Sequence, residues 1–170
     1  ATIDRLVTQH NRFGPAHDWA VELAKAKYPD EPLRPEVVKA RRIRLTSLGE
    51  DLIGDPVETA LAEAGRLANL RKDNVAAARV LVEVVGDAGE AEVEAQLILG
   101  ILKARQNQFA AAAEYLFQAA NGDPGVFQEV VLNSLLACLG RAGEAEAPGA
   151  GGGGLVQPER AREMLDELIE

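Results

Sequence analysis

At 170 residues, of which 47% are apolar and 26% charged, the chain has the size and composition of one folded domain and excludes a disordered or collagen-like protein. Residues 86–170 hold 5 Lys and Arg against 14 Asp and Glu, so they carry the whole net charge of −9 and disfavour binding to nucleic acid. A single cysteine excludes an internal disulfide, and the absence of a long apolar run predicts no membrane span; we expect a cytoplasmic protein, with a processed periplasmic form left open.

The positions of proline and glycine, together with the spacing of apolar residues, predict helices and no strand. Prolines stand where helices begin, glycines interrupt the pattern, and between them apolar residues recur at spacings of three and four. No segment alternates apolar and polar residues as a strand does. The sequence predicts an all-α fold of about nine helices, at roughly 2–12, 15–28, 35–53, 57–72, 74–86, 91–106, 109–121, 125–140 and 158–169.

One segment carries a repeat motif. A Leu-Gly pair is followed by an aromatic residue, alternating small and bulky residues and a closing proline, at Leu99, Gly100, Phe109, Ala112, Leu116, Ala119 and Pro124. This motif resembles the tetratricopeptide repeat, in which the small residues lie where two helices of a hairpin approach most closely. The resemblance implies a right-handed solenoid of helical hairpins that occupies residues 1–170 as one domain.

The resemblance is weaker in the rest of the chain. A step of 34 residues towards the N-terminus matches Val75, Ala78, Val82 and Val85 by size, so that the best repeats are 59–92 and 93–126. The helix expected at 35–53 has no place in this period and is interpreted as an extra helix. The Gly-rich stretch 148–154 is interpreted as a linker before the last helix.

No catalytic or metal-binding arrangement emerges from the reactive residues. His10 and His17 are the only histidines and are expected to be partly exposed, since no cluster of ligands accompanies them. Cys138 lies in an apolar helical run and is expected to be a buried small hydrophobe. The glycines of 148–154 lack the Lys and Ser or Thr of a phosphate loop. We therefore expect no enzyme activity, no cofactor and no metal.

Two other features favour structural roles. The basic run Lys39–Arg44 is expected to be a solvated helix face rather than an anion site, because no aromatic residue accompanies it. Trp19 and Tyr28 are expected to pack in the core or between repeats.

The resemblance also implies a binding surface. In this family the first helix of each hairpin lines a concave groove that holds a peptide or helix of a partner. Leu and Ile stand where some members carry the Lys and Asn that clamp acidic chaperone tails, so an amphipathic or apolar segment is the expected ligand. Arg71 and Arg105, 34 residues apart, are expected to take its carboxylates. Projected onto this chain, the groove residues are Glu63, Leu67, Leu70, Arg71, Glu94, Leu97, Ile101, Arg105, Gln128, Val131 and Leu135.

The expected function is therefore that of a protein-binding scaffold or adaptor, as part of a bacterial-style assembly or a chaperone-like module. Two alternatives stay open. The chain could be an accessory repeat segment of a multidomain enzyme or of a redox or chaperone protein, or it could self-assemble into a homo-oligomer.

Overall fold

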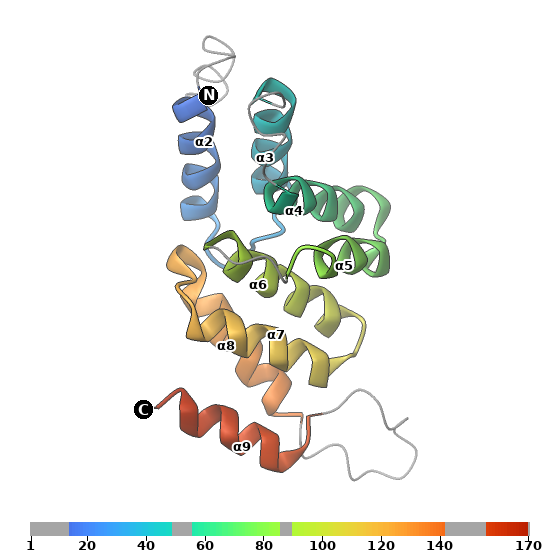
Figure 1. The fold of residues 1–170 in the computed structure, drawn as a ribbon, viewed down its shortest axis with the longest axis vertical. Helices are drawn as coiled ribbons and strands as arrows, with labels where there is room; N and C mark the ends of the chain where they lie inside the picture. The colour runs from blue at the N-terminus through green and yellow to red at the C-terminus, as the bar shows by residue number, and fades with distance from the viewer. Residues whose placement is uncertain (1–13, 49–55, 86–89, 142–155, 170) are drawn as a thin grey trace.

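The computed structural model describes residues 14–48, 56–85, 90–141 and 156–169, and within these ranges it contains helices and no strand (Figure 1). The all-α prediction is confirmed for this part of the chain. Eight α-helices are present in it, while the helix predicted at 2–12 and the Gly-rich stretch 148–154 lie outside it. The elements are α2 Gly14–Lys27, α3 Pro35–Leu48, α4 Pro56–Arg66, the π-helix η1 Leu67–Arg71, α5 Asn74–Val82, α6 Glu90–Arg105, α7 Phe109–Asn121, the 3-10 helix η2 Gly125–Phe127, α8 Gln128–Leu139 and α9 Pro158–Glu167.

Several helix ends follow directly from local chemistry. Pro35, Pro56 and Pro158 are the first residues of α3, α4 and α9, where the missing N–H of proline costs no hydrogen bond. The carboxylate of Asp73 caps α5 by accepting a hydrogen bond from the backbone N–H of Ala76 at 2.9 Å. Asn107, in the left-handed conformation at φ 60°, ends the hairpin turn after α6.

The helix predicted at 57–72 differs from the structure in its second half. The α-helix ends at Arg66, and Leu67–Arg71 continue as a π-helix that stops at Lys72, a left-handed residue with φ 55°. The amide of Asn69 donates a hydrogen bond to the backbone carbonyl of Leu33 at 2.7 Å. This bond ties the widened turn to the connection between α2 and α3.

Helices that follow one another in the chain pack against one another. Each of the pairs from α2–α3 to α7–α8 is in contact, and α6 with α7 is the most extensive. α3, which the 34-residue period left without a place, packs between α2 and α4. Two apolar cores result, one among α4, α5 and α6 and one among α6, α7, α8 and α9. Ile101 of α6 contacts both, so α6 forms the shared wall of the two cores.

Burial in the two central hairpins repeats every 35 residues, not every 34. Ala77 and Ala112 are both fully buried, and so are Leu81 and Leu116, each pair being 35 residues apart. The match of Val82 to Leu116 is wrong, because the side chain of Val82 is 50% exposed; Val75, matched to Phe109, is 55% exposed. The error of one residue moves a position by about 100° around a helix and hence from the core to the surface.

Gly65 and Gly100 also follow this spacing but serve different contacts. A Cβ at Gly100 would lie 2.6 Å from Cγ of Leu116, in the next helix α7. A Cβ at Gly65 would lie 2.7 Å from Cγ2 of Val38, in the preceding helix α3. Both glycines therefore permit close approach of two helices, and the prediction that Gly100 does so within its own hairpin is confirmed.

Candidate functional site

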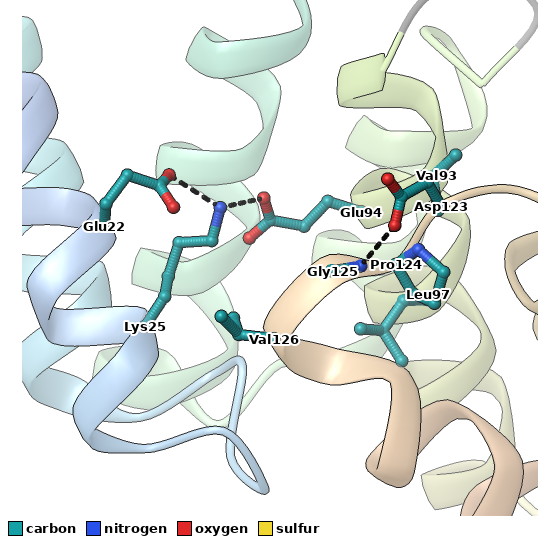
Figure 2. Close-up of a pocket in the computed structure, with 9 residues that line it drawn as sticks. All are labelled: Glu22, Lys25, Val93, Glu94, Leu97, Asp123, Pro124, Gly125 and Val126. Carbon is teal, nitrogen blue, oxygen red and sulfur yellow. Dashed lines mark hydrogen bonds and ion pairs between the residues drawn. The ribbon is translucent and has the colours of Figure 1, made fainter.

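A hollow lies where α2, α3, α4, α6 and the connection after α7 come together. It consists of two adjoining cavities of about 370 and 400 Å³, which share Glu22, Lys25 and Glu94 in their linings. The first is bounded by α2, α6 and the segment 123–126 (Figure 2), and the second by α2, α3 and α4. Each cavity has the size at which proteins begin to bind ligands or side chains of a partner.

A buried arginine forms the floor of the second cavity. Arg41 of α3 is only 3% exposed, and its guanidinium donates one hydrogen bond to Oε2 of Glu58 in α4 at 2.5 Å and another to Oε1 of Glu94 in α6. Arg44, one turn along α3, pairs with Asp18 of α2 at 2.6 Å and lies 3.6 Å from Glu58. Two arginines of α3 thus link this helix to α2, α4 and α6.

Lys25 joins the two cavities. Its ammonium lies 2.9 Å from the carboxylate of Glu22 and 3.2 Å from that of Glu94, and Figure 2 shows it between them. It also lies 5.7 Å from the centre of the Phe127 ring, within the range of a cation–π contact. The side chain therefore bridges α2 to α6 and to η2, segments far apart in the sequence.

The charges of the network favour the ionised forms of Glu94 and Arg41. Burial alone would raise the pKa of Glu94, but the positive charges of Arg41 and Lys25 outweigh it and lower the pKa below its ordinary value. Burial would lower the pKa of Arg41, but the carboxylates of Glu94 and Glu58 raise it above its ordinary value. At neutral pH Glu94 and Arg41 therefore form a charged pair, and Glu94 is not a proton donor.

The other end of the hollow is partly apolar. Val93, Leu97, Pro124 and Val126 contribute to its wall, and the side chain of Val126 is 42% exposed. Asp123 lies beside them, and its Oδ1 accepts a hydrogen bond from the backbone N–H of Gly125 at 3.0 Å (Figure 2). This bond shapes the turn that presents Val126 to the hollow.

The structure separates the predicted groove residues into three groups. Glu94 and Leu97 line the hollow, although Leu97 is almost wholly covered. Leu67, Val131 and Leu135 are buried in the apolar cores and pack between helices. The remaining predicted residues do not line the hollow: Ile101 is partly buried, Glu63 pairs with Arg66, and the exposed ones are Leu70, Arg71, Arg105 and Gln128.

Most residues of the hollow were missed by sequence analysis. Arg41 was assigned to a solvated face, but Val38, Arg41 and Leu45 follow one another at helical spacings of three and four, so the sequence does place Arg41 on the apolar stripe of α3. An arginine on an otherwise apolar helix stripe is a signal of a buried ion pair. No local signal marks Asp18, Glu22 or Asp123, because their proximity depends on how α2 lies against the segment after α7.

Other predictions about single residues can be compared with the structure. Lys39 and Arg42 are exposed as expected of the basic run. Cys138 is buried as expected, and burial raises the pKa of its thiol, which opposes a nucleophilic role. His17 is only 1% exposed and Trp19 is 59% exposed, so both expectations were wrong; Tyr28 is partly buried, with Arg34 stacked on its ring at 4.8 Å. His10 lies outside the described residues.

The described residues contain no group of three or more His, Cys, Asp and Glu side chains that could hold a metal ion. None of the helices in these ranges is both long enough and apolar enough to cross a membrane. Comparisons with protein-family models, curated proteins and solved structures gave no match to this chain. The relation to tetratricopeptide repeats accordingly stays a prediction from the sequence.

Proposed function

We propose that this chain is a protein-interaction scaffold, and that the hollow between α2, α3, α4, α6 and the segment 123–126 receives a peptide or helix of a partner protein. The observation that carries the proposal is the hollow itself, which draws its lining from five segments spread over the chain. A site assembled from so many segments depends on the curvature of a helical array, and concave surfaces of such arrays are where they bind.

The buried charges support this role by keeping the hollow open in one shape. Arg41 joins α3 to α4 and α6, and Lys25 joins α2 to α6, so the walls of the hollow are held at fixed positions before a partner arrives. A preformed site loses less conformational entropy on binding than one that must first be ordered. The adaptor role in a bacterial-style or chaperone-like assembly belongs to the same proposal.

Site-specific photo-crosslinking in the native cell tests the proposal. A photoreactive amino acid replaces Val126, in the hollow, and in a matched variant it replaces Val75, which is similarly exposed on α5 outside the hollow. We expect a discrete protein adduct from position 126 that position 75 does not give. Identical adducts from both positions, or none from 126, would contradict the proposal.

A further inference from the structure

The charges that line the hollow do not cancel. Among the residues that the structure describes, its two cavities together present five carboxylates, Asp18, Glu22, Glu58, Glu94 and Asp123, against three cations, Lys25, Arg41 and Arg44. Each cation already lies within 4 Å of two of these carboxylates. No cation of the hollow is left over for an acidic ligand, whereas negative charge remains.

Part of this remaining negative charge lies at the rim. Glu58 is buried and Glu94 is partly buried, and both pair with Arg41, whereas Asp18, Glu22 and Asp123 are exposed. Within the described residues, Asp123 forms no ion pair, and its bond to the N–H of Gly125 leaves its charge uncompensated. A ligand in the hollow therefore meets carboxylates at its edge and the apolar side chains of Val93 and Val126 beside them.

We infer that the segment bound here carries a Lys or Arg side chain next to an aliphatic or aromatic one, the cation reaching Asp123 and the apolar group covering Val126. This inference rests on the proposed function and specifies its partner. An acidic peptide would be repelled by the rim. A wholly apolar helix would bury the charge of Asp123 without a partner, which is costly.

Selection from a random-peptide phage library on the full chain tests the inference. The enriched peptides are synthesised and their affinities measured for two triple variants with the same change in net charge. In the hollow variant, Asp18→Asn, Glu22→Gln and Asp123→Asn keep the hydrogen-bond acceptors for Arg44, Lys25 and the N–H of Gly125. The control variant neutralises three exposed carboxylates of α9, Glu159→Gln, Asp166→Asn and Glu167→Gln.

We expect the enriched peptides to combine a basic and an apolar residue, and to bind the hollow variant about tenfold more weakly than the control variant. Equal weakening in both variants would show that peptides only respond to the net charge of −9, and overturns the inference. The inference is also overturned if the enriched peptides are acidic or uncharged. If Val126→Glu abolishes the binding of those peptides, the hollow remains a binding site. If Val126→Glu affects no enriched peptide, the proposed function itself fails.

Melting temperatures of both triple variants check that the fold is intact. If the hollow variant melts much earlier, the single change Asp123→Asn replaces it, because this exposed side chain accepts the bond from Gly125 as its one contact of this kind with the described residues, and Asn can accept that bond too. Its expected effect is a severalfold loss of affinity, and an unchanged affinity overturns the inference.

Discussion

The junction of α3 with α4 and α6 adds a set of charges to the close contact of Val38 with Gly65, whereas the junction of α6 with α7 is held by close contact between small and bulky apolar residues. In the first, Arg41 reaches Glu58 and Glu94, and the space beside them stays open as the hollow. In the second, Gly100 and Ala112 bring the helices together around Leu116, and Ala112 and Leu116 are fully buried. A cavity thus remains beside the charged side chains that link the helices, while the apolar packing of α6 on α7 closes the space.

The largest effect on stability is expected from removal of Arg41, the central residue of the charged junction. Arg41→Met leaves Glu58 and Glu94 partly buried without their guanidinium, and should lower the free energy of unfolding by about 3–5 kcal/mol. Arg42→Met, at the exposed neighbouring position, is the matched control and should change it by less than about 0.5 kcal/mol. Denaturant unfolding of the two variants measures the difference, and equal values would mean that the network does not hold the helices.

The apolar junctions should respond to deletion according to the 35-residue spacing. Leu81→Ala removes a fully buried side chain and should cost about 2–5 kcal/mol, as should Leu116→Ala in the next hairpin. Val82→Ala removes a half-exposed side chain and should cost less than about 1 kcal/mol. Thermal and denaturant unfolding can rank the two; a larger cost for Val82→Ala would restore the 34-residue alignment.

A larger side chain should destabilise the fold at the apolar junction but not on an exposed helix face. Ala112→Leu places three more carbon atoms at the contact of α6 with α7, and should cost about 1–3 kcal/mol. The same substitution at Ala137, on the exposed face of α8, should be nearly neutral. Similar melting temperatures for the two variants would show that the helices of this hairpin do not approach each other as described.

Of these two junctions, acid should weaken the charged one. Because the pKa of Glu94 is lowered in the folded state, its contribution to stability is complete above the ordinary pKa of about 4.3 and is lost as the pH falls through the folded-state pKa. Glu94→Gln should therefore be less stable than the native chain at pH 7, and the difference should shrink as the pH is lowered below about 4. A difference that stays constant with pH would exclude an ionised Glu94 as its source.

The smallest effect is expected from the two arginines that the sequence suggested for ligand binding. Arg71 and Arg105 are exposed and do not line the hollow, so the double change to Ala should alter the free energy of unfolding by less than about 1 kcal/mol. Affinity for the library-selected peptides should change less than about twofold, in contrast to the hollow variant. A loss as large as that of the hollow variant would extend the binding surface along the ends of η1 and α6.

The elements of this fold were predictable because local chemistry determines them. Prolines and the cap at Asp73 mark helix starts, and the spacing of Gly100, Ala112 and Leu116 identifies one hairpin contact correctly. The alignment of the neighbouring hairpin failed because small aliphatic residues follow one another there. Val82 follows Leu81 directly, so a shift of one residue changes the burial but hardly the size class.

The site was less predictable because it depends on long-range geometry. The chain alone places Arg41 on an apolar stripe, but it does not show which carboxylates compensate it. Glu94, predicted as a groove residue, lines the hollow, yet its partners come from α2 and α3, which the repeat pattern does not relate to α6. The π-helical turn at Leu67–Arg71 was likewise not predicted, and its Asn69 donates a hydrogen bond to the distant carbonyl of Leu33.

The reach of Arg41 has a consequence for how the chain unfolds. In an array whose units touch only their neighbours, terminal helices can fray while the centre stays folded. Arg41 contacts Glu58, 17 residues away, and Glu94, 53 residues away, so release of α3 exposes a carboxylate in each of two later helices. Backbone amides of α3 should therefore exchange with solvent together with those of α4 and α6, as one cooperative unit, and more slowly than the amides of α9.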